Sequence, residues 1–319
     1  MDNSSTGVAP DFFIVGSVRT GSTMLRLMLG HHPEIARCDE MEYLLPGIEM
    51  MEEGRPIQAF RDFLEYDRIF QLYDYTIPQA GTYQALSEDI FRQLSEADGR
   101  RILGGTIHND FALLAKVWPN CKYIFLDRDP RDVARSVINM GWAGTAWHGA
   151  EFWQRAKLNW QELSTRVPES QRLELRFEDL VAEPEALLGK VCKFLGVDYT
   201  PEMLGIDSDT TYRPPSKSEA ASWEKKSKPR EIAEVETRVG KSLIVESGYQ
   251  VSDYPAIDTG GLAMLQLALR NKYGRSRHQW QQIGFKWWLL RIIANKTGSQ
   301  ALHRYIAPTI NAKENEHLK

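Results

Sequence analysis

The chain has 319 residues, of which 42% are hydrophobic and 26% charged, and its formal net charge is −4. This is ordinary globular composition, with enough apolar mass for one large core or two smaller ones, and it excludes a protein that coats nucleic acid. The three cysteines, Cys38, Cys121 and Cys192, are far apart and lack C-x-x-C spacing. We therefore expect no disulfide framework, no bound metal and a reducing, cytoplasmic compartment.

The first residues, MDNSSTGVAPDFF, contain neither a positively charged segment nor an apolar segment of the kind found in signal peptides. We expect no signal peptide, and no transmembrane span either, because no run of about 18 apolar residues occurs. The nearest approach is residues 285–294, which are short and include Lys286 and Arg291. Packing within the chain is the expectation for this segment, with contact to a membrane surface or a partner chain as the alternative.

Residues 12–15 (FFIV) are a short apolar run that ends at Gly16, which predicts a buried parallel strand. After a Gly/Ser/Thr stretch, residues 24–29 carry the apolar face of a helix that Gly30 and Pro33 end. A strand, a glycine loop and a helix in this order open an α/β unit.

Further strands are predicted at residues 101–106, 122–127 and 172–177, and helices at 110–117, 130–139, 142–160, within 178–195 and at 230–247. Between them lie a largely helical covering segment at 40–100 and a polar loop at 205–230. The alternation predicts an α/β fold with a P-loop-like, mainly parallel sheet flanked by helices. We expect one domain over residues 1–254 and a helical C-terminal extension over 255–319, packed on the same domain.

The loop after the first strand has the chemistry of an anion site. Backbone N–H groups at a helix N-terminus bind anions, and Gly16 and Gly21 let the backbone approach phosphate oxygens. Their spacing equals that of the nucleoside-triphosphate P-loop, but Ser22 stands where that motif has lysine, and the cation of the loop is Arg19. Without the lysine, an ATP-hydrolysing site is disfavoured.

The segment Arg19-Thr20-Gly21-Ser22-Thr23 resembles the 5′-phosphosulfate loop of sulfotransferases that use 3′-phosphoadenosine-5′-phosphosulfate (PAPS). An arginine at its first position is usual in the carbohydrate and tyrosyl-protein branches of that family. A second segment, starting at Arg128 and reaching Ser136, resembles the family's 3′-phosphate motif, Arg–Asp/Asn–Pro–Arg–Asp–x–x–x–Ser. Two motifs in the family's order, each where a strand meets a helix, make the resemblance specific.

Three weaker matches extend the resemblance over residues 10–250. The segment 175–180 (LRFEDL) resembles the family's strand and turn, for which we expect a structural capping role. Trp223-Glu224-Lys225-Lys226 resembles a late segment that closes over the nucleotide, and Gly248-Tyr249 matches the end of that region. The charged residues 131, 132 and 135 are expected to form ion pairs at a helix start.

The resemblance implies a sulfotransferase that moves the sulfuryl group from PAPS to a hydroxyl and releases adenosine-3′,5′-bisphosphate. Arg19 would stabilise developing charge, Thr20, Gly21, Ser22 and Thr23 would bind the 5′-phosphate, and Arg128 and Ser136 the 3′-phosphate, with Trp223 and Lys225 also on the nucleotide. By analogy with phosphoryl transfer, positioning and charge stabilisation should dominate. No metal is required by this arrangement.

The general base is open between three residues. In the resembling branches a glutamate after an "HP" pair is the base, and Glu40 matches it best, with Glu42 as runner-up. His108 is the rival, because it follows a predicted strand and a histidine at the carboxyl end of a strand can act as a general base. Relatives carry a lysine near His108 that this chain lacks.

The sequence does not identify the acceptor, which is left as a glycan, a lipid or a small-molecule alcohol. We expect no nucleic-acid partner, and a homo-oligomer stays an open alternative. Two alternatives to sulfuryl transfer stay open: a P-loop nucleotide kinase or NTPase-like protein, and a non-catalytic nucleotide-binding relative. Binding of adenosine-3′,5′-bisphosphate without magnesium would favour the sulfotransferase hypothesis.

Overall fold

The computed structural model describes residues 8–205, 220–299, 302, 305–310 and 313. Most of the predicted polar loop at 205–230 therefore lies outside the described residues. Contacts divide the chain into two compact units, unit 1 with residues 1–129 and 152–222, and unit 2 with residues 130–151 and 223–319. The predicted domain boundary at residue 254 stays a prediction.

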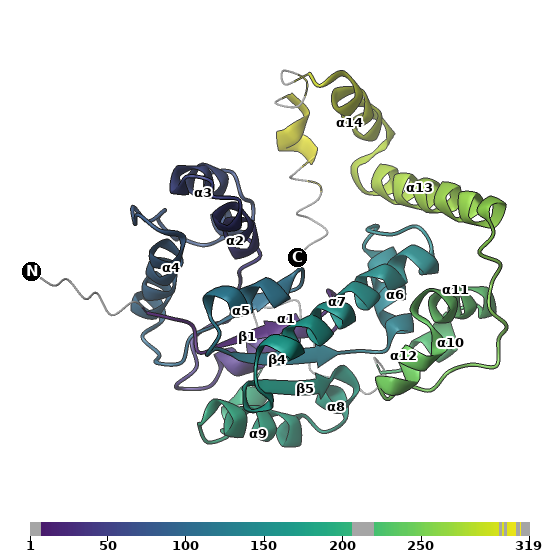
Figure 1. The fold of residues 1–319 in the computed structure, drawn as a ribbon. Helices are drawn as coiled ribbons and strands as arrows, with labels where there is room; N and C mark the ends of the chain where they lie inside the picture. Colours follow the sequence, from purple (N-terminus) through teal and green to yellow (C-terminus); the bar gives the residue numbers. More distant parts are fainter. Residues whose placement is uncertain (1–7, 206–219, 300–301, 303–304, 311–312, 314–319) are drawn as a thin grey trace, which may run out of the picture. The chain divides into compact units, whose positions relative to one another are not determined.

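Unit 1 contains a five-stranded sheet in the order β2-β3-β1-β4-β5, in which every pair of neighbours is parallel (Figure 1). The strands are β1 (Phe12–Val15), β2 (Asp39–Glu40), β3 (Gly104–Ile107), β4 (Lys122–Asp127) and β5 (Arg172–Arg176). In the register, Val15 lies opposite Ile107 on one side and Phe125 on the other. The segments that follow β1, β3 and β4 therefore leave the same edge of the sheet.

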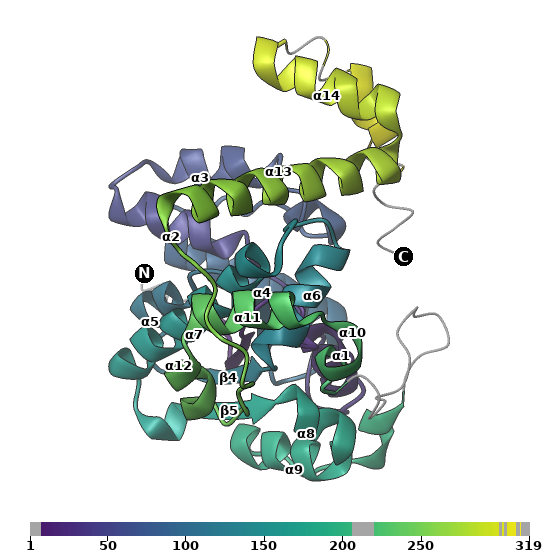
Figure 2. The same cartoon turned by 90° about the vertical axis from the view of Figure 1, so that its right-hand side faces the viewer.

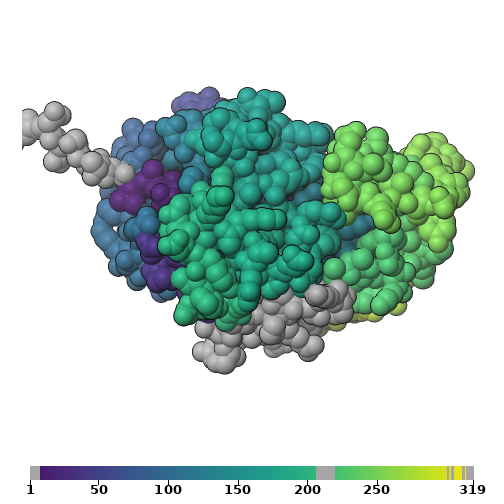
Figure 3. All heavy atoms as spheres, turned by 90° about the horizontal axis from the view of Figure 1, so that it is seen from below, coloured from purple at the N-terminus to yellow at the C-terminus, as the bar shows by residue number. Residues whose placement is uncertain are grey.

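Helices cover both faces of this sheet. Phe12 and Ile14 belong to one apolar cluster and Phe13 and Val15 to another, because successive side chains of a strand point to opposite faces. The first cluster includes apolar side chains of α1 (Ser22–Gly30), α8 (Phe177–Ala182) and α9 (Pro184–Leu195). Figure 3 views the side of α8 and α9 and shows their atoms close-packed.

The second cluster includes side chains of α2 (Leu44–Glu52), α3 (Ile57–Leu64), α4 (Tyr83–Asp98), α5 (Leu114–Val117) and the later turns of α7 (Ala146–Arg166). Short 3-10 helices complete unit 1 at Phe70–Leu72, Phe111–Leu113, Glu169–Gln171 and Pro201–Leu204. The result is the three-layer arrangement that alternating strands and helices predict, and the predicted α/β fold class is confirmed.

Unit 2 is helical in the part that the structure describes. Its elements are α6 (Pro130–Asn139), the first turns of α7, α10 (Trp223–Lys226), α11 (Pro229–Val239), α12 (Lys241–Glu246), α13 (Gly261–Ile283) and α14 (Phe285–Thr297). Its centre is polar, since Arg131 and Glu236 form a buried ion pair at 3.0 Å. Buried Glu234 accepts hydrogen bonds from Arg270 at 2.9 Å and Arg230 at 3.3 Å. Breaking such a pair would leave a buried charge without compensation.

The predicted strands at 12–15 and 122–127 have their predicted bounds, and the fourth is one residue shorter. The second strand begins at residue 104 instead of 101. Strand β2 was not predicted, because two residues show no periodicity. The helix expected at 142–160 begins at 146 and ends at 166, and Gly141 precedes it with a left-handed φ of 72°.

Candidate active site

The loop between β1 and α1 has a backbone shape that requires its glycines. A Cβ on Gly21 would lie 2.4 Å from the ring of Phe177, and φ at this residue is 92°. A Cβ on Gly16 would lie 2.5 Å from the carbonyl oxygen of Leu126. Arg19 has a left-handed φ of 69°, and the Thr20 hydroxyl donates to the carbonyl of Ser17 at 2.9 Å. The loop is thus held in one shape by steric contact and hydrogen bonding.

The loop suits an anion. The first N–H groups of α1 have no acceptor within the helix, its first turn has no acidic residue, and no side chain caps it. The Ser17 hydroxyl is buried with no hydrogen-bond partner among the described residues. No carboxylate occurs in residues 16–23, while Arg19 supplies a positive charge. These features fit the phosphosulfate end of a nucleotide.

Arg128 lies against this loop, as the sequence predicted from its position after β4. Its Nη1 donates to the carbonyl oxygen of Arg19 at 3.2 Å, and its guanidinium lies 4.2 Å from the ring centre of Phe177. Phe177 thus forms a wall for both Gly21 and Arg128. This contact was not predicted, because in the sequence Phe177 resembles an ordinary core aromatic. The next residue, Glu178, accepts the backbone N–H of Asp129 at 3.0 Å, in accord with the expected capping role.

His108 follows β3 and reaches the loop. Its Nδ1 is 3.2 Å from the carbonyl oxygen of Gly16, and its Nε2 is 3.4 Å from the Ser22 hydroxyl. Because a carbonyl only accepts, the geometry assigns the proton to Nδ1 and leaves Nε2 to accept from Ser22. His108 therefore bridges the start and the end of the loop.

Glu42 holds His108 in place. Its carboxylate accepts the backbone N–H of His108 and, at 3.3 Å, the side-chain amide of Asn109. Burial raises the pKa of Glu42, and the hydrogen bonds from the backbone N–H of His108 and from Asn109 oppose that rise. Both oxygens of Glu42 are thus engaged.

Glu40 lies at the end of β2, beside Thr106 of β3. Its carboxylate is 3.7 Å from the guanidinium of Arg26, and its backbone N–H donates to the Tyr73 hydroxyl at 2.9 Å. The side chain is 35% exposed, so a single long ion pair leaves it open to solvent. The structure therefore places Glu40 on the strand next to the one that precedes His108, and its carboxylate has fewer hydrogen-bond contacts than that of Glu42.

The remaining predicted nucleotide contacts belong to unit 2. Ser136 lies in α6, and Trp223 and Lys225 lie in α10. The Trp223 ring is stacked on Arg131, whose guanidinium carbon is 3.6 Å from the ring centre. Arg131 itself is paired with Glu236 of α11, a partner distant in the sequence, whereas a partner near the helix start was expected. The nucleotide-binding roles of Ser136, Trp223 and Lys225 stay predictions.

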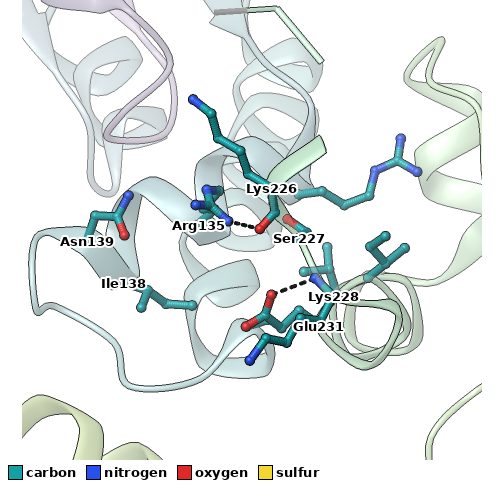
Figure 4. A pocket seen from close by; sticks show the side chains of 11 residues that line it. Arg135, Ile138, Asn139, Lys226, Ser227, Lys228 and Glu231 are labelled. Carbon is teal, nitrogen blue, oxygen red and sulfur yellow. Dashed lines mark hydrogen bonds between the residues drawn. The ribbon is translucent and has the colours of Figure 1, made fainter. Parts of the chain in front are cut away.

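Unit 2 also contains a pocket of about 310 Å³ between α6 and α11 (Figure 4). Arg135 and Lys226 line it, and a hydrogen bond joins the guanidinium of Arg135 to the carbonyl oxygen of Lys226. Glu231 lies at its edge, where its carboxylate accepts the backbone N–H of Lys228 at 2.8 Å. Ser136 lies roughly 140° around α6 from Arg131, which lines the pocket. Asn139, which also lines the pocket, lies roughly 60° from Ser136, but Ser136 itself does not line it.

Over the described ranges, no group of three or more His, Cys, Asp and Glu side chains is arranged to hold a metal ion. In that same part of the chain, no helix is both long enough and apolar enough to span a bilayer.

Comparison with known proteins gives a consistent family. A model described as "Sulfotransferase family" matches residues 10–201. Protein-tyrosine sulfotransferase A of Caenorhabditis elegans is 26% identical over 64% of this chain and 54% of its own length, and protein-tyrosine sulfotransferase 2 of Gallus gallus is 25% identical over 61% and 53%. The chain thus spans about half the length of these curated relatives.

Among solved structures, the sulfotransferase domain of the Synechococcus PCC 7002 olefin synthase superposes with a TM-score of 0.56. It is 23% identical and covers 76% of this chain and 96% of that one, a likeness that concerns the fold. The strand–loop–helix fold expected from the sequence is therefore shared with a solved sulfotransferase domain.

The predicted cytoplasmic compartment is wrong. The relatives from Caenorhabditis elegans, Gallus gallus and Drosophila melanogaster are all protein-tyrosine sulfotransferases, which do not support that compartment. The prediction depended on unpaired cysteines, but all three thiols are buried. A buried thiol is inert in either redox environment, so it says nothing about the compartment.

The matched residues 10–201 contain the phosphate loop, Glu40, His108 and the segment from Arg128 to Ser136. The family match therefore covers the two motifs on which the sequence resemblance depended, and it confirms both the predicted family and the predicted class of enzyme. The donor that the resemblance implies, PAPS, is consistent with this family. The chain belongs to the sulfotransferase family.

Proposed function

We propose that this protein transfers the sulfuryl group of PAPS to a hydroxyl of a protein acceptor, with tyrosine as the first candidate. The observation that carries the proposal is the loop of residues 16–23, which has an anion-binding backbone and lacks the P-loop lysine. Arg19 belongs to this loop, and Arg128 contacts it through the carbonyl oxygen of Arg19. The names of the curated relatives support a tyrosyl acceptor.

The bound donor supplies an activated sulfuryl group. The acceptor oxygen forms a bond to sulfur while the bond from sulfur to the bridging phosphate oxygen breaks, giving a sulfate ester and adenosine-3′,5′-bisphosphate. The N–H groups at the start of α1, including that of Ser22, and the hydroxyl of Thr23 bind the 5′-phosphate, and Arg19 stabilises the charge that develops on the bridging oxygen. Donors fixed before the reaction need no reorganisation when charge develops.

Glu40 is the proposed acceptor of the proton that the hydroxyl loses. Its carboxylate is 35% exposed and has one long contact, with Arg26, whereas both oxygens of Glu42 accept hydrogen bonds. The resemblance to the tyrosyl-protein branch also supports Glu40. His108 is a positioning residue in this scheme, because it joins Gly16 to Ser22 and keeps the loop in shape.

The test of the transfer reaction uses the full chain, PAPS and a tyrosine-containing peptide, with the sulfated product detected by mass spectrometry. Arg19→Ala should lower kcat by about 100- to 1,000-fold, the usual cost of removing one charge-stabilising donor. Arg92→Ala is the control, since Arg92 forms only exposed ion pairs with Asp89 and Glu96. Full activity in Arg19→Ala would refute the role of Arg19.

Binding measurements separate the donor from the acceptor. Adenosine-3′,5′-bisphosphate should bind by titration calorimetry without magnesium. If only ATP with magnesium binds, the sulfotransferase proposal fails. If the bisphosphate binds and PAPS is consumed with a sugar or lipid hydroxyl but never with tyrosine, only the choice of acceptor is wrong.

The base assignment has its own test. Glu40→Gln should lower kcat by about 100- to 10,000-fold with little change in KM for PAPS, as expected for a lost general base. His108→Gln should mainly raise KM for PAPS, and Glu42→Gln should do so to a lesser degree. The reverse pattern, with kcat lost in His108→Gln and kept in Glu40→Gln, would make His108 the base. Exposed Glu53→Gln is the matched control.

A further inference from the structure

The two C-terminal helices of unit 2 have a composition unlike the rest of the chain. Residues 261–299 contain seven of the chain's 39 Lys and Arg residues and none of its 43 Asp and Glu residues. The chain as a whole has a formal net charge of −4. A net charge of +7 is thus concentrated on α13, α14 and the residues that directly follow.

Helix α13, whose ribbon is labelled in Figure 2, exposes an apolar stripe. Five large apolar side chains on it are between 40% and 72% exposed: Leu262, Leu265, Leu269, Tyr273 and Trp280. At about 100° of rotation per residue they lie within about 80° of arc, so they form one line along the helix. Scattered exposed apolar residues are normal, but a continuous line of them marks an interaction surface.

The opposite face of α13 attaches the helix to the rest of unit 2. Asn271 accepts the backbone N–H of Gly144 at 2.7 Å, and the ring of His278 hydrogen-bonds to the carbonyl oxygen of Asn139 at 2.9 Å. Gly274 packs so closely on Gly144 that a Cβ would lie 2.7 Å from its Cα. The helix is therefore held through small and polar residues and through buried Leu267, while its exposed apolar stripe faces away from these contacts. A surface helix of a globular protein normally has the reverse arrangement.

Helix α14 continues the surface. Phe285, Leu289 and Ile293 are between 41% and 58% exposed and are spaced by four residues. Its other side packs in a small buried cluster with Ile306 and Ile310. The expectation of packing within the chain is thus met by one side of α14 only.

Aromatic rings concentrate where α13 meets α14. The ring of Phe285 is 6.1 Å from that of Trp280 and 5.5 Å from that of Trp288, between ring centres. Trp and Phe rings next to Lys and Arg are the side chains that insert at the boundary between lipid head groups and acyl chains.

We propose that α13 and α14 bind the surface of a membrane that contains anionic lipid. The apolar stripe would enter the head-group boundary. Lys272 lies roughly 80° to one side of Leu262 around the helix and Arg277 roughly 60° to the other, and both would contact lipid phosphates. A second copy docked through the same helices would place +7 against +7, which disfavours that occupant. A nucleic acid would use the cations but leave the leucines exposed to water.

The experiment is sedimentation of the full chain with vesicles of phosphatidylcholine alone or with about 30% phosphatidylserine. The protein should bind the anionic vesicles and bind the neutral ones on the order of tenfold less. The double variant Leu265→Glu/Leu269→Glu should weaken binding about tenfold or more, because it places charge on the inserted stripe. The double variant Lys272→Glu/Arg277→Glu should remove the preference for phosphatidylserine.

Leu72→Glu is the matched control, because Leu72 is equally exposed but belongs to unit 1. It should bind as the unchanged protein does. Should the leucine variant lose its fold by circular dichroism, brominated lipids give a second reading: they should quench the tryptophan fluorescence of the unchanged protein, and less so in Trp280→Phe.

Three results would overturn the proposal. The first is no sedimentation of the unchanged protein with either vesicle. The second is equal loss of binding in Leu72→Glu and in the stripe variant. The third is a stripe that instead mediates dimerisation or DNA binding, seen as a concentration-dependent mass or a mobility shift that the leucine variant abolishes. None of these results affects the PAPS proposal, because α13 and α14 lie outside the matched residues 10–201.

Discussion

Helices α1 and α13 both carry apolar residues along one side, yet this side is buried in α1 and exposed in α13. In α1, Leu25 and Met28 are fully buried beneath the sheet of unit 1. In α13, Leu262 and Leu269 are mostly exposed, and the contacts are made by the other side of the helix, which carries Asn271 and buried Leu267. An amphipathic pattern therefore predicts a helix and the side that needs a partner, but it does not say whether that partner is the protein's own core.

The comparison predicts its largest effect for truncation of one leucine in each helix. Leu25→Ala should lower the free energy of unfolding by about 2–5 kcal/mol, because it leaves a cavity in the core. Leu269→Ala should change it by no more than about 0.5 kcal/mol, because the side chain is exposed. Urea unfolding followed by tryptophan fluorescence measures both. Equal losses in the two variants would mean that the α13 stripe is already covered in the free protein.

A second prediction compares glycines at helix ends. A Cβ at Gly21, before α1, would meet Phe177 at 2.4 Å, whereas one at Gly298, after α14, would meet no atom within 4 Å. Both have left-handed φ, 92° and 63°. Gly21→Ala should destabilise by about 3 kcal/mol through overlap and strain, and Gly298→Ala by about 1 kcal/mol through strain alone.

The same urea experiment measures the glycine pair, and Gly21→Ala should also weaken binding of adenosine-3′,5′-bisphosphate. A bisphosphate affinity unchanged by Gly21→Ala would show that the loop backbone does not hold the nucleotide.

A third prediction concerns pH. Burial raises the pKa of Asp127 to about 6, and Lys157 only partly offsets the rise. The Asp127 carboxyl therefore stabilises the folded state fully below about pH 4, where it is protonated in both the folded and the unfolded state. This stabilisation is lost as the pH rises through about 6. A shift of this size is on the order of 2–3 kcal/mol.

Asp127→Asn should flatten this part of the stability profile, measured by urea unfolding from pH 4 to pH 7. The buried carboxyls Asp39, Glu42 and Glu178 also have raised pKa values, so a smaller slope of the same sign should persist. Lys272→Gln on α13, a segment without carboxylates, should leave the slope as it is. A profile that keeps its full slope in Asp127→Asn would assign the effect to other groups.

Much of the fold was predictable, because the central strands are short, continuous apolar runs that end at turn residues. The meeting of Arg128 with the loop was also predictable, since the carboxyl ends of parallel strands share an edge. Strand β2 has only two residues, and its pairing depends on β3, about 65 positions along the chain. Periodicity cannot detect such a contact.

The same limit applies to the site. Two contacts of the site join segments that are distant in the sequence. They are the hydrogen bond from the backbone N–H of His108 to Glu42 and the packing of Phe177 against Gly21. Each residue alone resembles a surface acid or a core aromatic. The roles of Glu40 and His108 stay predictions, because both lie near the loop end of the sheet and only kinetics separates them.

The central place of β1 in the sheet has a consequence for the order of folding. Its partners, β3 and β4, begin at residues 104 and 122, so closing either pair means closing a loop of about 90 to 110 residues. During synthesis, the strand that carries the phosphate loop has no neighbour until more than a third of the chain has emerged. The donor-binding loop, first along the sequence among the functional segments, should be among the last to acquire its shape.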